Sequence, residues 1–564
     1  MNRRLKRRGL GIFLITLVGM TLGIIFSAAR DRMKYVEASM AGDIRQINLY
    51  LTNDPEVSVN GFETMDGTEW FFLPYGMTDG EWSVDLPTGT NCLIDGQYYK
   101  DGDQIKALDS AADHEIVLGD ALGNRLDERV LRVRCAEGVP CIVIDTASGS
   151  TDTLNASKEN EEGALVKILY DDQSVNYQGI VKMSGHGNST WSQDKKSYNL
   201  TLTEDASLLG LSAQRRWTII SNCMDLSQIR NKLVYDTAVQ MGVKDQPTGN
   251  YANVYINREY VGVYLLTQNL ATENGTQKDF KSTRVETIKP VPTPDEVPSV
   301  STSETDADGL VERYFNQKYN IDDITGDYLL EFQTFGMEVD PDTKYGYFTT
   351  PNKLIAIRST KYADKEEVDY NARLCREAEK AIYAKNGINP DTGKSYTDYI
   401  DTDSFALNYL IQDFFDRHDY TDGSLFMRKN RGDDKLYSGV VWDYDKAMTD
   451  EYYDDIRYDY THGARLPGWY QTLDDLHPEF HARVVQWYKD KFSDTVGAVI
   501  SSEAPALIAQ MTSSWNMDDI RHGKEEGFTA AYAGEQVEWL SKRKALFDQV
   551  WIDGEDSPYA RNIY

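Results

Sequence analysis

The first thirty residues constrain this chain more than any other segment. Basic side chains crowd its first eight residues, and an uncharged run from Leu10 to Ala29 follows them. As a helix this run is roughly 30 Å long, which matches the hydrocarbon core of a bilayer. The excess of Arg and Lys before the run places the tip in the cytoplasm and everything after Arg30 outside. We therefore expect residues 1–34 to form a cytoplasmic basic tip and a single transmembrane helix.

A cleaved signal peptide is the alternative for this segment. Ser27, Ala28 and Ala29 resemble a signal-peptidase site. The apolar run is long for a signal peptide, and its length favours the anchor. Both alternatives place the bulk of the chain outside the cytoplasm, membrane-anchored in one case and secreted in the other.

The excess of acidic residues restricts the kinds of partner that the chain can bind. The 564 residues include 90 Asp and Glu against 59 Lys and Arg, a formal net charge of -31. An acidic surface repels phosphate backbones, so we expect no binding to nucleic acid. A chain of this length exceeds one ordinary core, so we expect several domains. Composition leaves the oligomeric state open.

The five cysteines carry no metal or redox motif, because no Cys-x-x-Cys pair occurs. Cys135 and Cys141 flank a short segment, and either a local disulfide or two buried thiols fits this spacing.

Residues 35–135 and 136–564 differ in pattern. The first range contains short runs rich in aromatic and β-branched residues between Gly, Asp, Asn and Pro clusters, which predicts a small all-β sandwich. The second range mixes strand-like segments with helical ones and becomes largely helical towards its end, which predicts an α+β domain. Residues 290–308 are dominated by Pro, Ser, Thr and acids, so we expect a disordered insertion there.

One glycine-containing segment resembles a phosphate-binding loop. Gly185, Gly187 and Asn188 precede Lys195 and Lys196, which stand at the start of a predicted strand. Glycines let backbone N–H groups approach phosphate oxygens, and a strand-borne Lys holds a phosphate in a fixed place. A plain tight turn is the alternative for the two glycines.

Two acidic segments follow much later in the chain. Asp419 lies in a loop, a predicted hairpin comes next, and Asp443 and Asp445 follow the apolar pair Val440-Val441. A loop Asp, a hairpin and an Asp that closes a strand is the order found in protein kinases, where the first orients the acceptor hydroxyl and the second binds Mg²⁺. A solvated acidic turn is the alternative.

These segments together resemble the spore-coat CotH kinases, a family of atypical protein kinases. The resemblance covers about residues 139–552 and depends on several motifs in order: SGHGNSTWSQDKKSYNLTL, RRWTIISNCMDLSQIRNKL, NREYVGVYLLTQN, DYLLEFQ and VVWDYDKAM. It implies an atypical protein-kinase-like domain that binds ATP and Mg²⁺. The expected architecture is this domain preceded by the β sandwich and the transmembrane helix.

The resemblance also implies roles for individual residues. Lys196, or Lys195, contacts the nucleotide phosphates; Asp419 is the catalytic Asp; and Asp443 binds the metal with Asp445 beside it. The glycine segment lies near the phosphates.

Five further positions concern the kinase motifs. Asp225, Arg230 and Asn231 match the family's D-x-S-x-x-R-N stretch, either as a structural motif or as part of the site. Gln268 takes a place near the nucleotide where the family often has Glu, and Arg417 stands where it commonly has Asn.

Three functions fit these observations. The first is an extracytoplasmic kinase that phosphorylates a surface or exported protein. The second is a non-catalytic surface scaffold or adhesion protein that retains the fold, which the neutral Gln268 and the scarcity of extracellular ATP favour. The third is a carbohydrate-associated module, which exposed Trp and Tyr side chains in the amino-terminal β region would favour.

Overall fold

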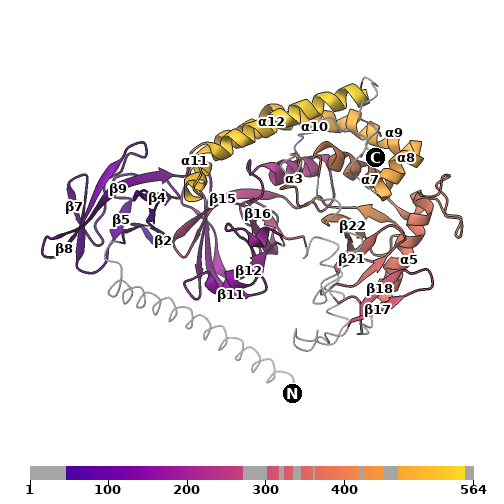
Figure 1. The fold of residues 1–564 in the computed structure, drawn as a ribbon, viewed down its shortest axis with the longest axis horizontal. Coiled ribbons are helices and arrows are strands. Elements are labelled where there is room, and N and C mark those ends of the chain that lie inside the picture. The colour runs from indigo at the N-terminus through magenta and orange to yellow at the C-terminus, as the bar shows by residue number, and fades with distance from the viewer. Residues whose placement is uncertain are drawn as a thin grey trace, which may run out of the picture. The chain divides into compact units, whose positions relative to one another are not determined.

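The computed structural model describes residues 46–187, 189–270, 301–316, 323–333, 345–359, 362–417, 423–448 and 468–552 (Figure 1). They divide into two compact units. Within the described residues, the first unit comprises the chain up to Cys223 with Asn250–Leu266 and Ala509–Ala530. The second comprises Met224–Gly249, Thr267–Ile508 and the chain from Ala531 onwards.

The first unit begins with two β-sheets, as the short aromatic runs predict. A three-stranded sheet has the order β2-β1-β5, and a six-stranded sheet has the order β3-β4-β9-β8-β6-β7. The strands are β1 (Asn48–Leu51), β2 (Asp54–Asn60), β3 (Phe62–Glu63), β4 (Glu69–Leu73), β5 (Trp82–Asp85), β6 (Thr90–Ile94), β7 (Gln97–Lys100), β8 (His114–Asp120) and β9 (Arg125–Cys135).

Side chains of both sheets share one apolar core. Trp82 and Phe71 are fully buried in it, and the same core includes Val143, Tyr255 and Met517 from later in the first unit. Burial of large side chains is the main favourable term in folding. This core therefore links the β region to the rest of its unit. That residues 35–135 form a domain of their own stays a prediction.

A closed barrel completes the strands of the first unit. Its order is β10-β11-β12-β13-β14-β16-β15, with β15 parallel to β10 where the barrel closes. The strands are β10 (Cys141–Thr146), β11 (Glu161–Leu169), β12 (Val175–His186), β13 (Ser197–Ala206), β14 (Gln214–Ile220), β15 (Gly249–Ile256) and β16 (Glu259–Gln268), with the short helix α2 (Asp152–Ala156) and the 3₁₀ turn η1 (Ser189–Ser192) between them.

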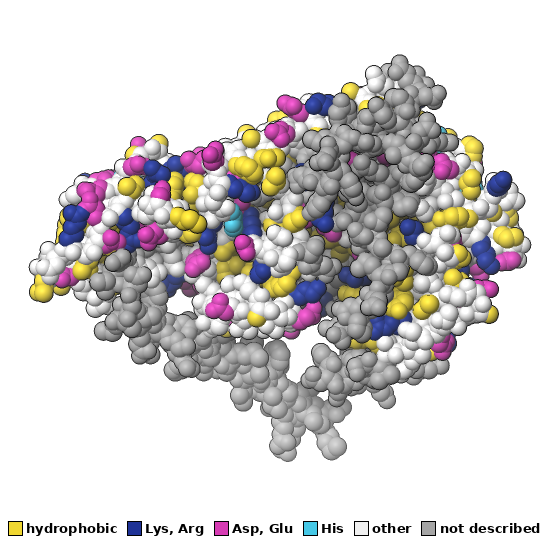
Figure 2. Space-filling view, in the orientation of Figure 1, with side chains coloured by type: hydrophobic (Ala, Val, Ile, Leu, Met, Phe, Trp, Pro, Cys, Tyr) yellow, Lys and Arg dark blue, Asp and Glu magenta, His cyan; other side chains and the backbone are white. Residues whose placement is uncertain are grey.

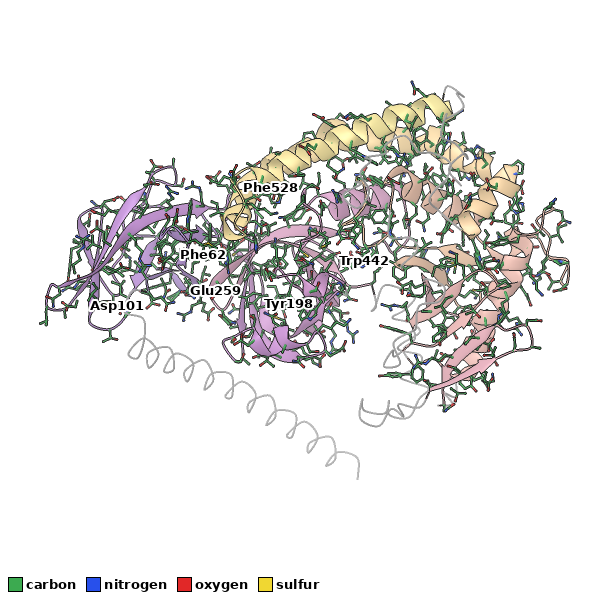
Figure 3. The ribbon with its side chains drawn as sticks, in the orientation of Figure 1. Phe62, Asp101, Tyr198, Glu259, Trp442 and Phe528 are labelled. Atoms are coloured by element: carbon green, nitrogen blue, oxygen red, sulfur yellow. The ribbon has the colours of Figure 1, made fainter. Side chains whose placement is uncertain are left out.

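The segment ANVYINREYVGVYLLTQN forms a hairpin of the barrel, with β15 and β16 on either side of a short polar turn. Asn257 and Arg258 form its turn with φ of 51° and 73°, the left-handed geometry that two-residue hairpins prefer. Trp217, Tyr264 and Leu200 are buried in the barrel core. Tyr198, labelled in Figure 3, packs its ring against Trp191 at 6.2 Å between centroids.

A seven-stranded antiparallel sheet forms the framework of the second unit. Its order is β17-β18-β20-β21-β19-β22-β23, and α5 packs against β18 and β20. The strands are β17 (Ser301–Thr305), β18 (Val311–Phe315), β19 (Tyr328–Gln333), β20 (Tyr347–Thr349), β21 (Leu354–Ser359), β22 (Leu425–Lys429) and β23 (Leu436–Ser438). The β22–β23 pairing confirms the hairpin expected between the two acidic segments.

The expected disordered insertion at residues 290–308 is corrected in part. Residues 301–305 form β17 and pair with β18, and Asp306 accepts N–H bonds from Asp308 and Leu310 in the turn between them. Asp is well suited to such a turn because its carboxylate accepts these bonds, so a polar sequence forms a hairpin here. Residues 290–300 lie outside the described residues.

Helices make up most of the described part of the chain's last third, as expected. The described helices of the second unit, together with α11, are α3 (Arg230–Met241), α5 (Lys365–Ile382), α6 (Tyr396–Tyr399), α7 (Thr402–Phe414), α8 (Trp469–Leu476), α9 (Pro478–Trp487), α10 (Ser493–Ala498), α11 (Ala504–Arg521) and α12 (Phe528–Phe547), with π-helical turns at Tyr488–Phe492, Val499–Glu503 and Asp548–Ile552. Local signals set their ends: Asp364 and Glu367 form a capping box before α5, and Gly242 ends α3 with φ of 87°.

None of the five cysteines, all of which lie in the described residues, forms a disulfide bond. The disulfide alternative for Cys135 and Cys141 is therefore wrong, because Cys141 is fully buried with its Sγ 3.2 Å from the Tyr75 hydroxyl. Burial raises the pKa of the Cys141 thiol to about 12. It is a core residue.

The described residues confirm a mixed α+β protein. Acidic and basic side chains are interspersed on the face shown in Figure 2. In the part of the chain that the structure describes, no helix is long and apolar enough to cross a membrane. The anchor expected at residues 1–34 lies outside that part.

Candidate functional site

Lys195 enters a buried ion pair in the first unit. Its Nζ lies 2.6 Å from Oδ1 of Asp518 on α11, and the two side chains are only 8% and 3% exposed. The ammonium also lies 5.1 Å from the centroid of the Tyr264 ring. Lys195 stands two residues before β13 begins, which fixes its main chain at the barrel rim. Its charge is held in one place rather than free in solvent.

Asp518 is surrounded by further polar groups. The main-chain N–H of Val263 donates to the same Oδ1 at 2.9 Å, and His522 Nε2 lies 3.7 Å from it. Burial opposes ionisation of Asp518, but Lys195 and His522 more than offset it, so the pKa of Asp518 lies below its ordinary value. Burial lowers the pKa of His522.

Lys196 has a different environment from its neighbour. Its Nζ donates to the main-chain carbonyls of Trp191 at 2.8 Å and Gln193 at 3.0 Å. The ammonium also lies 4.9 Å from the Trp191 ring. Lys196 thus closes the turn that precedes it. The geometry favours Lys195 over Lys196 as the lysine that the fold holds in place. The family motif favours Lys196, so the geometry reverses that order of preference.

The expected glycine loop is corrected at Gly185. This residue lies in β12, paired with Tyr198, and not in a loop. A Cβ at Gly185 would lie 2.6 Å from the Trp191 ring, so close packing of that ring accounts for the glycine. Gly187 does lie in the turn, with φ of 100°. Asn188 lies outside the described residues.

Asp443 belongs to the second unit, and the strand expected before it is absent. β23 ends at Ser438, and Val440 and Val441 are buried without strand structure. Asp443 itself has φ of 67°. This left-handed conformation is uncommon outside glycine, although Asp adopts it more readily than most residues, and it occurs often at functional sites.

Polar contacts hold Asp443 in this conformation. Ser424 Oγ donates to Asp443 Oδ2 at 3.1 Å, and the Asp443 N–H donates to the Tyr235 hydroxyl at 3.3 Å. The Tyr235 ring stacks on Trp442, labelled in Figure 3, with 5.5 Å between centroids.

Arg417 is buried and serves the main chain around Asp443. Its Nη2 donates to the Gly423 carbonyl at 2.8 Å and its Nε to the Asp443 carbonyl at 3.4 Å. The side chain is 2% exposed. Arg417 therefore links the main chain at Gly423 to the main chain at Asp443. Asp419, the expected catalytic residue, lies outside the described residues.

The D-x-S-x-x-R-N stretch has a structural role. Asp225 accepts main-chain N–H bonds from Ser227 and Arg230, both at 2.9 Å, which starts α3. Arg230 Nη1 donates to the Asp445 carbonyl at 2.8 Å, and Asn231 Oδ1 accepts the Tyr444 N–H at 2.8 Å. The stretch thus binds the main chain of the WDYD segment.

Three residues at this site, Gln536, Glu331 and Ser424, were not predicted from the sequence. Gln536 on α12 accepts from Arg230 Nε at 2.8 Å and donates to the Met448 carbonyl at 2.8 Å. Glu331 on β19 accepts the Ser424 N–H at 2.7 Å, and Ser424 contacts Asp443 as described. Glu331 lies in the motif DYLLEFQ, and that was the one available signal for it, whereas Gln536 lies outside the quoted motifs.

Gln268 ends β16 and ties it to β15. Its Oε1 accepts the Thr248 N–H at 3.3 Å, and the Thr267 hydroxyl donates to the Thr248 carbonyl at 2.7 Å. The amide thus has a main-chain partner at the strand end.

The residues near Asp443 fit a magnesium ion that is shared with a substrate. Mg²⁺ is bound through one or two carboxylates plus substrate phosphates. Asp443 offers a half-buried carboxylate with a serine hydroxyl beside it, and Asp445, 6% exposed, follows two residues later. Among the described residues, no group of three or more His, Cys, Asp or Glu side chains is arranged to hold a metal ion by itself. This donor set suits shared coordination rather than a cage made by protein alone.

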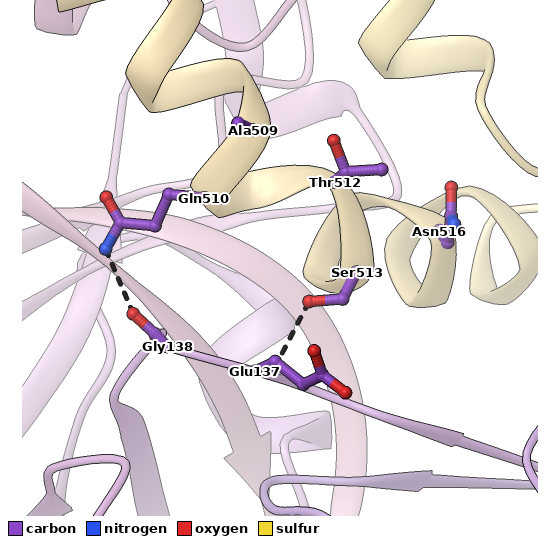
Figure 4. Close-up of a pocket in the computed structure, with 7 residues that line it drawn as sticks. All are labelled: Glu137, Gly138, Ala509, Gln510, Thr512, Ser513 and Asn516. Atoms are coloured by element: carbon purple, nitrogen blue, oxygen red, sulfur yellow. Dashed lines mark hydrogen bonds between the residues drawn. The ribbon is translucent and has the colours of Figure 1, made fainter.

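The first unit also has a shallow pocket, and neither Lys195 nor Asp443 is among the residues that line it. It has a volume of about 500 Å³ and lies between the segment Glu137–Gly138 and one side of α11 (Figure 4). Gln510 donates to the Gly138 carbonyl at 3.0 Å, and the Glu137 N–H donates to Ser513 Oγ at 3.2 Å. These bonds fasten α11 to the chain that links the sheets to the barrel.

Comparison with protein families identifies the class. The model of the CotH kinase protein family matches residues 183–544, more than half of the chain. The chain therefore belongs to the CotH kinase family. The match lies within the range of about 139–552 over which the motifs indicate the resemblance.

Other comparisons add little. No curated protein matches the chain. Among solved structures, one match is a protein from Bacteroides thetaiotaomicron proposed to be a glycoside hydrolase, at 11% identity over 58% of this chain and 85% of that one. The TM-score of 0.12 is too low to support an argument about fold.

Proposed function

We propose that this chain is an extracytoplasmic, membrane-anchored kinase that transfers the γ-phosphoryl group of ATP to a hydroxyl of a surface or exported protein. Membership of the CotH kinase family supports this reading. The observation that carries it is Asp443, held in a left-handed conformation by the side chains of Ser424, Tyr235 and Arg417 in the second unit. Strained backbone that its surroundings hold so firmly is typical of catalytic sites.

The proposed roles in the second unit follow from phosphoryl-transfer chemistry. The acceptor oxygen forms a bond to the γ-phosphorus, the bond from that phosphorus to the β–γ bridging oxygen breaks, and the hydroxyl proton passes to the Asp419 carboxylate. Asp443, with Asp445 beside it, binds Mg²⁺, which when bound neutralises charge on the phosphates. Arg417, Arg230 and Asn231 keep this segment in place through its main chain.

In the first unit, we assign the phosphate-binding role to Lys195. A lysine that acts on a phosphate must be fixed, because positioning and electrostatics dominate this chemistry. Lys195 is fixed by Asp518, whereas Lys196 is occupied by the carbonyls of the preceding turn. Gly187 and Asn188 keep the proposed position near the phosphates, and Gln268 keeps a proposed place near the nucleotide.

The location outside the cytoplasm depends on the amino-terminal pattern alone. The basic tip and the uncharged run of residues 10–29 have the length and flanks of a single-pass anchor, with secretion as the alternative if that segment is cleaved. A protein acceptor at the cell surface or in transit fits this location.

The test compares full-length wild type with two site variants and a control, in detergent. ATP binding is measured by calorimetry with and without Mg²⁺, and transfer is measured as autophosphorylation. Asp443→Asn keeps an acceptor for Ser424 but should lose Mg²⁺-dependent binding. Asp419→Asn should bind ATP and lose transfer by roughly a thousandfold or more.

Asp434→Asn is the matched control, because Asp434 is an exposed acid in the turn of the same hairpin. It should behave as wild type. Equal, metal-independent behaviour of all four proteins would contradict the kinase and leave the surface scaffold as the function.

A further inference from the structure

Asp518 is far from Lys195 in the sequence. In the fold, its carboxylate is in direct contact with the Lys195 ammonium. The two residues are 323 positions apart, and the Nζ to Oδ1 distance is 2.6 Å. Asp518 belongs to α11, which contributes no residue to the motifs by which the family is recognised in this sequence. Both residues lie in the first unit.

A buried ion pair of this kind is costly to keep for stability alone. Removing two charges from water costs several kcal/mol per ion, and well-packed apolar residues often stabilise a protein as much or more. The pair here is almost wholly buried, at 8% and 3% exposure. Fixing the position of a charge is a better reason for it than stability.

The barrel is built to admit this pair. Gly262 has φ of 117°, and a Cβ there would lie 2.1 Å from Asp518 Oδ1 and 2.9 Å from Lys195 Cε. Any other residue at position 262 would therefore displace the carboxylate, the lysine or both.

Two further contacts fix the helix that carries Asp518. Asn253 Nδ2 donates to Ser514 Oγ at 2.9 Å, and Arg521 Nε donates to the Tyr260 carbonyl at 2.8 Å. These bonds lie about one turn before and after Asp518 and hold α11 against β15 and β16. The carboxylate therefore has a rigid support on both sides.

We propose that Asp518 is a positioning residue for the nucleotide: it holds the Lys195 ammonium where that group binds the phosphates of ATP. The proposal rests on the proposed kinase function. Asp518 acts through Lys195 and has no part in the transfer itself. Because the side chain of Lys195 is already ordered in the folded protein, its entropy is not lost on binding, and this raises the affinity for ATP.

The test uses Asp518→Asn with Asp519→Asn as its matched control. Asp519 is the next residue of the same helix, is fully buried, and accepts from the Thr529 N–H at 3.0 Å and the Thr529 hydroxyl at 2.6 Å. Both variants remove one buried negative charge and keep an acceptor oxygen. Mg–ATP affinity is measured by calorimetry on the full chain, and stability by thermal unfolding.

The expected result is a split between the two variants. Asp518→Asn should weaken Mg–ATP binding by roughly tenfold or more, the scale of a lost charge-assisted bond. Asp519→Asn should leave the affinity unchanged even where it lowers the melting temperature as much. In a Lys195→Met background, Asp518→Asn should have no further effect on affinity, because its partner is already absent.

Other outcomes separate the two hypotheses. If Lys195→Met abolishes binding and Asp518→Asn does not alter it, the positioning role is wrong and the kinase function stands. Equal losses of affinity in Asp518→Asn and Asp519→Asn would also overturn the positioning role. If wild type binds no Mg–ATP, the kinase function is wrong and the positioning role with it. Asp518→Glu, which keeps the charge, replaces Asp518→Asn in each comparison if the latter does not fold.

Discussion

Asn231 on α3 accepts the main-chain N–H of Tyr444 at 2.8 Å, and both residues are buried. Tyr444 lies between the two carboxylates of the WDYD segment, so this one bond fixes the peptide that separates Asp443 from Asp445. Arg230, the preceding residue of α3, donates from Nη1 to the Asp445 carbonyl. Two adjacent residues of a helix therefore define the path of the proposed metal-binding segment.

Replacing Asn231 by Ala should destabilise the second unit and weaken its metal-dependent binding. The Tyr444 N–H would be left buried without its acceptor, which costs about 1–3 kcal/mol. Chemical denaturation checks the stability, and calorimetry checks Mg–ATP affinity. Gln240→Ala, an exposed position on the same helix, is the control and should change neither. An Asn231→Ala protein with wild-type stability would show that the bond has no energetic role.

Lys195 and Lys196 should respond differently to substitution. Lys195→Met removes the ammonium that pairs with the buried carboxylate of Asp518, which destabilises the protein by about 3–5 kcal/mol, and it removes the proposed phosphate ligand. Lys196→Met removes two bonds to carbonyls of a partly exposed turn and should cost about 1 kcal/mol. Thermal unfolding and Mg–ATP titration of both variants measure this. A larger loss of affinity in Lys196→Met would return the phosphate role to Lys196.

Local features of the fold follow well from the sequence. The hairpin at Asn257 and Arg258 is predictable because a short polar turn separates two alternating apolar runs, and the structure has the expected strands on each side. The start of α5 is predictable from Asp364 and Glu367, whose spacing of three residues is that of a capping box. Such features depend on neighbours in the chain, and a single sequence contains that information.

The contacts that define the candidate site depend on distant segments and could not be predicted in this way. Nothing near Lys195 indicates that its partner is Asp518 rather than any other acid. The apolar pair Val440-Val441 reads as a strand by composition, but its backbone polar groups bond elsewhere: the Val441 N–H donates to Gln246 at 2.8 Å. Gly185 reads as a loop glycine until the Trp191 ring is seen against it.

The bulk of the chain should be digestible from outside the cell. The basic tip and uncharged run predict that everything after Arg30 lies beyond the cytoplasmic membrane. Protease added to intact protoplasts should therefore degrade the carboxyl-terminal part, which an antibody to that part can follow. A cytoplasmic protein measured in the same samples controls for lysis. Protection until the protoplasts are lysed would contradict this location.

Glu69 predicts a pH dependence of stability in the first unit. It is 4% exposed and pairs with Arg129. Burial, only partly offset by Arg129, raises the pKa of Glu69 from 4.5 to about 7. Between these values the folded protein retains a proton that the unfolded chain has lost, so a rise in pH favours unfolding. The stability lost from pH 4.5 to pH 7 is no more than about 3 kcal/mol, and little more is lost above that range.

Glu69→Gln should remove this part of the pH dependence. The amide does not titrate and keeps an oxygen for Arg129, so the variant should gain stability relative to wild type as the pH rises from 5 to 8. Denaturant unfolding at several pH values, followed by the fluorescence of the buried Trp residues, measures the difference in the free energy of unfolding. Glu63→Gln is the control, because Glu63 approaches the same arginine but is 61% exposed, and it should follow the wild-type curve. Parallel curves for wild type and Glu69→Gln would mean that Arg129 keeps Glu69 ionised throughout this range.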